Sequence, residues 1–141
     1  MLFRSHLTGE SAYQERASRA IASFGGRLEE QGRAVPFMAA ALETALADSE
    51  QIVIVGPRDA AATSAMWRAA HRTYRPFAVM TLVDPSQQDG IARHMPWIAQ
   101  MKMIDGQPTV YVCRGFACDA PSTDPAALVQ RRNGDDAEAT S

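Results

Sequence analysis

The chain has 141 residues, a hydrophobic fraction of 46%, a charged fraction of 21% and a net charge of −2. This length predicts one domain, or one core with an appendage, and the near-neutral charge gives no electrostatic reason to expect nucleic acid or an anionic membrane as a partner. No apolar run reaches the roughly 20 residues that span a bilayer, and two cysteines are too few for a disulfide scaffold.

The first six residues contain neither a long apolar core nor a small-residue cleavage site. We therefore expect no signal peptide and a cytoplasmic protein.

Residues 1–48 predict a helical hairpin. Apolar side chains from Tyr13 to Leu28 recur at steps of three and four, which makes one apolar stripe, and Pro36 suits the first turn of a second helix. A lone amphipathic hairpin needs something to cover its stripe. We therefore expect the hairpin to pack on the rest of the chain, to self-associate or to bind another polypeptide.

Residues 49–131 alternate between strand and helix patterns, which predicts an α/β fold with a small three-stranded parallel βαβαβα sheet. We expect the hairpin to pack on this sheet, and residues 132–141 to form a polar, disordered tail. The predicted strands cover residues 51–55, 77–83 and 108–113, and the predicted helices cover residues 60–74, part of 89–103 and a segment opened by Asp124-Pro125.

Polar side chains follow each predicted strand. Arg58 and Asp59 come after the first strand, Asp84 after the second, and Cys113 and Arg114 at the end of the third. In open parallel sheets ligands gather at the carboxyl ends of the strands, so these residues, together with Cys118, are the candidate site. The alternative is that they only terminate strands and cap helices.

The spacing of Cys113 and Cys118 differs from the Cys-x-x-Cys of thioredoxins. The pair could close a small loop, but in a reducing cytoplasm we expect free thiols. Zinc would need two more ligands, and His71 and His94 lack metal-ligand spacing. A nucleotide fingerprint would need three glycines, where this chain has only Gly56 before a proline. We therefore expect no metal and no cofactor.

Three blocks of sequence, in this order and spacing, match a pattern found in one protein family. They are Leu7-Thr8-Gly9-Glu10 with Tyr13 and Arg16-Ala17, then Ile52–Gly56, then Gly106-Gln107-Pro108-Thr109 with Tyr111-Val112-Cys113, Phe116, Cys118, Pro121 and Thr123-Asp124-Pro125. Over residues 1–131 the chain resembles the C-terminal region of the large thioredoxin domain-containing proteins similar to spermatogenesis-associated protein 20.

The resemblance implies a longer protein, in which a thioredoxin-like domain precedes an (α/α)6 barrel of the sugar-epimerase and six-hairpin glycosidase kind. The hairpin would be the last hairpin of that barrel, and the α/β part a terminal subdomain. No catalytic residue carries over, because the redox motif and most of the barrel are absent.

Three hypotheses about function follow. The first is a non-catalytic C-terminal fragment with a structural or docking role, from a truncated or split gene product, whose partner is the missing thioredoxin and barrel region or a second copy. The second is part of a redox or carbohydrate-active enzyme whose catalytic domains lie in the missing region. The third is a stand-alone dithiol or metal-binding module.

Overall fold

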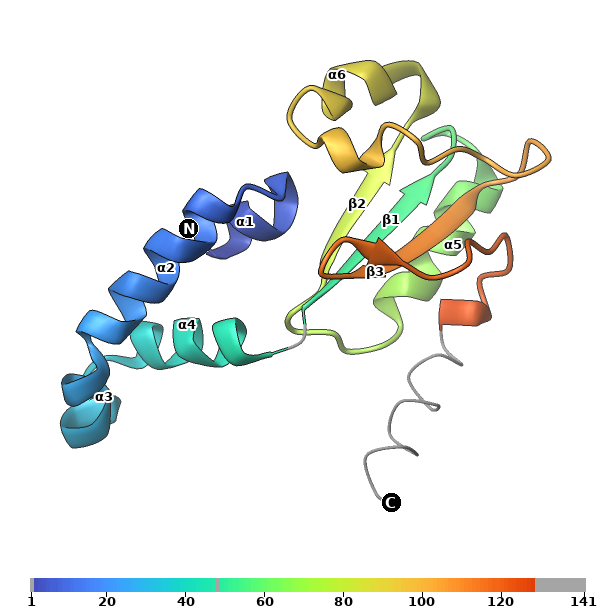
Figure 1. Ribbon diagram of the computed structural model, residues 1–141. Helices are drawn as coiled ribbons and strands as arrows, with labels where there is room; N and C mark the ends of the chain where they lie inside the picture. Colours follow the sequence, from blue (N-terminus) through green and yellow to red (C-terminus); the bar gives the residue numbers. More distant parts are fainter. Residues whose placement is uncertain (1, 48, 129–141) are drawn as a thin grey trace.

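The computed structural model describes residues 2–47 and 49–128 (Figure 1). The N-terminal part is helical, with α1 (Leu2–Thr8), α2 (Ser11–Ser23), α3 (Gly25–Gln31), the 3₁₀-helix η1 (Gly32–Ala34) and α4 (Pro36–Leu46). The remainder contains β1 (Glu50–Val55), α5 (Ala61–His71), β2 (Val79–Val83), η2 (Pro85–Gln87), α6 (Gln88–Ala92), η3 (Pro96–Ile98), β3 (Thr109–Arg114) and β4 (Ala117–Cys118).

The sheet has four strands in the order β2-β1-β3-β4. Strands β1 and β2 are parallel, as predicted, and α5 connects them. Strand β3 is antiparallel to β1, and β4 is antiparallel to β3. The fold is therefore α/β, but the prediction of a three-stranded parallel sheet is wrong.

The reversal of β3 follows from the connection that precedes it. A parallel β3 would require the chain to return along the whole sheet, and the six residues of β1 extend about 20 Å. Helix α6 has five residues, about 7.5 Å, so it does not span the sheet as the crossover helix of a parallel unit does. Thr109 instead pairs with Val55, and β3 begins at the edge where β2 ends.

Both faces of the sheet are buried, because alternate residues of β1 enter two different cores. Ile52 and Ile54 pack with side chains from α5 and β3, including Met66 and Val112. Val53 and Val55 face the opposite side and belong to the second core, where residues 95–101 cover the sheet. These four residues of β1 are at most 1% exposed, as expected for the central strand of a covered sheet.

The predicted helices at the N-terminus form, but they do not cover a face of the sheet. Helices α2 and α4 contact each other and lie to one side of the sheet (Figure 1). The N-terminal helices contact the second part through α1, a separate helix that precedes the two helices of the predicted hairpin. Leu7 of α1 packs against the second core, and His6 lies 3.1 Å from the hydroxyl of Ser49.

The predicted last helix is described only at its beginning. Asp124 caps it as expected, since its Oδ1 accepts a hydrogen bond of 2.8 Å from the backbone N–H of Ala126. The rest of this segment and the predicted tail at residues 132–141 lie outside the described residues.

Candidate functional site

The structure divides the six predicted site residues between two edges of the sheet. Arg58, Asp59 and Asp84 follow the carboxyl ends of the parallel strands β1 and β2. Cys113 and Arg114 end the antiparallel strand β3, so they lie at the opposite edge, where Arg114 pairs with Glu50 at the start of β1. The expected convergence at one edge fails because it assumed that all three strands point the same way.

At the first edge, Asp84 connects two loops. Its carboxylate accepts hydrogen bonds of 2.6 Å from the Ser86 hydroxyl and 2.9 Å from the Arg58 backbone N–H. The Ser86 hydroxyl, followed by the Arg58 N–H, lowers the pKa of Asp84 below its usual value. The carboxylate therefore serves as a cap for the loops after β1 and β2. Asp59 is exposed.

Near this edge, the surface of α5 carries a hollow of about 230 Å³ lined by Arg58, Thr63, Ser64, Trp67, Arg68 and Leu82. The hydroxyl of Thr63 is buried and has no hydrogen-bond partner. It faces the backbone of Gly56, where an added Cβ would lie only 2.5 Å away. The hydroxyl is thus used in close packing of α5 on the end of β1.

At the opposite edge, Cys113 and Cys118 form a disulfide, so the expectation of free thiols is wrong. The two cysteines are paired across β3 and β4. Between them, Gly115 and Phe116 have φ values of +55° and +67°, as the two central residues of a type I′ hairpin turn require. In a hairpin with a two-residue turn, residues five apart in sequence can lie opposite each other on the two strands. The Cys-x4-Cys spacing was therefore the sequence signal for this disulfide.

A charge cluster beside the disulfide was missed in the sequence. Glu50 forms ion pairs with Arg75, in the loop after α5, and with Arg114, the latter at 2.9 Å. Arg75 also donates a hydrogen bond of 2.6 Å to the backbone carbonyl of Leu128. Asp119 lies 4.0 Å from Arg114. Nothing in the spacing of these residues indicates the cluster, because strand pairing and a loop bring them together.

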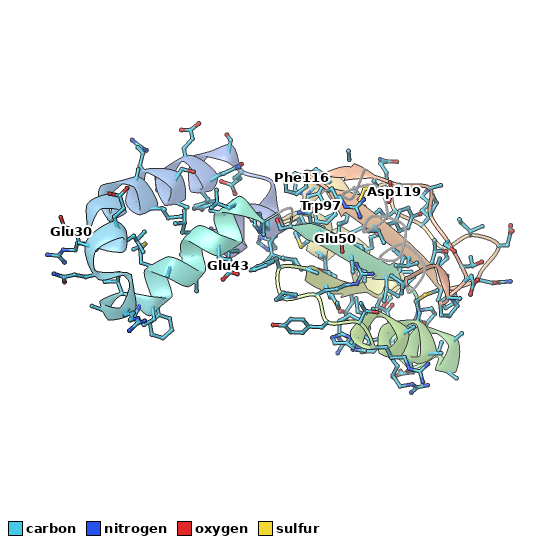
Figure 2. All side chains as sticks on the ribbon, turned by 90° about the horizontal axis from the view of Figure 1, so that it is seen from below. Glu30, Glu43, Glu50, Trp97, Phe116 and Asp119 are labelled. Atoms are coloured by element: carbon cyan, nitrogen blue, oxygen red, sulfur yellow. A yellow bond between two sulfur atoms is a disulfide. The ribbon has the colours of Figure 1, made fainter. Side chains whose placement is uncertain are left out.

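The hairpin turn between the cysteines also reaches the N-terminal helices. The ring of Phe116 packs edge-on against Trp97, with 5.5 Å between the ring centroids, and Figure 2 shows the two side by side. The same ring lies against Gly9, between α1 and α2, where an added Cβ would be 3.5 Å from it. Trp97 in turn donates a hydrogen bond of 2.8 Å to the carbonyl of Leu7. We call Phe116, Trp97, Leu7 and Gly9 the aromatic bridge.

The N-terminal helices leave apolar side chains uncovered. Helix α4 has no buried residue, and Phe37 and Leu46 in it are 92% and 77% exposed. In α2 the only buried residue is Ala17. Phe37 and Leu46 are nine residues apart, so they lie on opposite sides of α4, and both sides of this helix are open to solvent.

Within residues 2–47 and 49–128, no three potential metal ligands come together. In the same part of the chain, no helix is both long and apolar enough to cross a membrane.

These features define an α/β module with a disulfide-closed strand edge and an exposed helical hairpin. The chain is homologous to a segment of spermatogenesis-associated protein 20. It is 32% identical to the human protein over 128 residues, which are 90% of this chain and 16% of the human one. The rat and mouse proteins are 30% and 29% identical over the same length.

The chain thus spans about one sixth of the length of these curated relatives. No family model matches the sequence. No solved structure matches it either.

Proposed function

We propose that this chain is a non-catalytic docking module of a larger protein, and that the exposed surface of helix α4 in its helical hairpin is the docking surface. The observation that carries the proposal is that Phe37 and Leu46, on opposite sides of α4, are 92% and 77% exposed. Burying a side chain of this size contributes about 1.5–3 kcal/mol. Covering the two would therefore stabilise a complex substantially.

The composition of α4 supports the same proposal. Of its 11 residues, only Glu43 is charged, and Thr44 turns its hydroxyl back onto the carbonyl of Ala40 with a hydrogen bond of 2.7 Å. A helix that faces water on most sides ordinarily carries charged residues on its exposed face. Small alanines between the larger side chains also let another helix approach closely.

For the occupant, we propose the part of the larger protein that the relatives contain and this chain lacks. The 128 matched residues are 16% of the human relative, so most of such a protein lies outside this segment. The resemblance implies that the hairpin completes an (α/α)6 barrel, whose neighbouring helices would cover α2 and α4. In this proposal, any redox or sugar chemistry of the larger protein takes place in that barrel and in a thioredoxin-like domain, both outside this chain.

The test is co-expression of this chain with the part of human spermatogenesis-associated protein 20 that lies outside the matched residues. The matched human segment is the positive control for binding. We expect a one-to-one complex by light scattering, and its loss in the Phe37→Glu/Leu46→Glu variant. The variant Ile104→Glu changes an exposed apolar residue outside the hairpin and should bind normally.

Two results would overturn the proposal. One is a human segment that binds while this chain does not. The other is a complex that survives the Phe37→Glu/Leu46→Glu changes. A chain that forms stable dimers alone, and that the double variant makes monomeric, would assign the surface to a second copy of this chain instead.

A second candidate function is a dithiol module, and the observation that favours it is the Cys113–Cys118 disulfide. Its test is titration of free thiols after treatment with a dithiol reductant.

A further inference from the structure

We propose that the Cys113–Cys118 disulfide is a reduction site for dithiols. We further propose that its redox state controls how firmly α1 attaches the helical hairpin to the rest of the chain. This inference deepens the second candidate function, on which it rests, and it does not depend on docking, since it concerns the position of the hairpin within this chain.

The disulfide joins an exposed residue to a buried one. Cys118 is exposed, whereas Cys113 is fully buried against the second core. Thiol–disulfide exchange begins with a thiolate that reaches one sulfur of the bond, and access decides which sulfur is attacked. Cys118 Sγ is therefore the point of attack.

The exchange balances as follows. A thiolate of the dithiol bonds to Cys118 Sγ, the bond between the two sulfurs breaks, and Cys113 leaves as a thiolate that takes up a proton. The second thiol of the reductant, after losing its proton, attacks the mixed disulfide and releases Cys118. The protein gains two electrons and two protons, and the reductant becomes a disulfide.

The bond closes the turn that carries Phe116. Phe116 has a φ of +67°, a backbone conformation that bulky side chains rarely adopt, so the surrounding structure must hold it there. Strand β4 pairs Cys118 with Cys113 and Ala117 with Arg114, and the chain after it remains bound to β3 through the N–H of Asp119 and the bridge between Ser122 and Val110. The disulfide is the covalent constraint next to the turn itself.

The held turn contacts the point where the N-terminal helices join the sheet. Phe116 packs on Trp97 and against Gly9, and Trp97 donates a hydrogen bond to the carbonyl of Leu7. Leu7 and Gly9 belong to the end of α1 and its turn into α2. Reduction therefore frees Phe116 from the aromatic bridge and loosens the attachment of α1, which lets the hairpin change its orientation.

The experiment is hydrogen exchange of the full chain, oxidised and after dithiothreitol in native buffer, with free thiols counted in parallel. We expect two thiols per chain after reduction. Amides of residues 5–9, where the Gly9 N–H donates to the Ser5 carbonyl, should exchange at least about ten-fold faster, while β1 stays protected. The Cys113→Ser/Cys118→Ser variant should behave like the reduced chain, without responding to dithiothreitol.

A second variant separates coupling from general loss of structure. Phe116→Ala, with the disulfide intact, should raise exchange at residues 5–9 as reduction does. Ile104→Ala is the matched control, because Ile104 and Phe116 are both 37% exposed, and it should leave that exchange unchanged. Unchanged exchange in Phe116→Ala, or a disulfide that stays oxidised in native buffer, would overturn the inference. If reduction also speeds hydrogen exchange in β1, it has loosened the sheet itself. The exchange of residues 5–9 in Phe116→Ala then decides whether the turn holds α1.

Discussion

Glu50 and Arg75 form an ion pair in which the side chains are only 16% and 7% exposed. Glu50 begins β1, and Arg75 lies in the loop that leads from α5 to β2. The same glutamate also binds Arg114, whose side chain is 42% exposed. One carboxylate thus connects the central strand to a buried cation on one side and to a partly solvated cation on the other.

The two arginines should differ in their contribution to stability. Arg75→Met removes the buried ion pair and the hydrogen bond to the carbonyl of Leu128, whereas Glu50 keeps Arg114 as a partner, so the free energy of unfolding should fall by about 1.5–3 kcal/mol. Arg114→Met removes a partly solvated pair and should cost about 1 kcal/mol or less. Urea unfolding of both variants measures the difference. Equal losses in the two variants would contradict the assignment.

Gly56 should not tolerate a side chain. An added Cβ would lie 2.5 Å from Thr63 Oγ1 and 3.1 Å from Pro108 Cβ, so Gly56→Ala forces the end of β1 and α5 apart. We expect a loss of about 1–3 kcal/mol, the usual cost of overpacking, measured by thermal or urea unfolding. Gly90→Ala is the control, because α6 has open space at that position.

Shortening Thr63 should relieve the clash at Gly56. Thr63→Ala removes the hydroxyl that meets the new methyl group, so Gly56→Ala/Thr63→Ala should recover part of the lost stability relative to Gly56→Ala. A double variant whose losses simply add would show that the clash lies with Pro108 instead.

A charge in the central strand should prevent folding. Ile54 is fully buried and pairs with Leu82 and Val110 on its two neighbours. Ile54→Asp places a carboxylate there without a partner, so we expect no cooperative melt by circular dichroism. Ala62→Asp adds the same charge at an exposed position in the first turn of α5 and should melt like the parent chain. A cooperative melt of Ile54→Asp would refute the central place of β1.

Stability should fall as the pH is lowered through the range in which histidine titrates. Desolvation by burial lowers the pKa of His6 below 6.5, so the unfolded chain binds a proton at this residue more readily than the folded chain. The free energy of unfolding should therefore decrease as the pH falls below about 6.5, and level off below the pKa of the folded state. Urea unfolding between pH 7.5 and 5 checks this. His6→Gln should weaken the dependence, whereas His94→Gln, at an exposed residue, should retain it.

Patterns along the chain were enough to predict the local elements. Its apolar and β-branched runs predicted β1, β2 and β3, the three- and four-residue periodicity predicted α2 and α5, and Pro36 marked the start of α4. These features depend on residues near each other in the chain, whose side-chain pattern decides which backbone conformation can bury apolar surface. The homology to spermatogenesis-associated protein 20 was also readable from motifs.

The direction of β3, and with it the division of the candidate site, became visible only in the folded chain. The direction of a strand depends on the end of the sheet at which the preceding connection stops. No residue within Thr109–Arg114 encodes that end. The ion pairs of Glu50 and the contacts of Phe116 with Gly9 and Trp97 likewise join residues far apart in sequence. Such contacts arise from the packing of whole elements, so a pattern that is local along the chain cannot specify them.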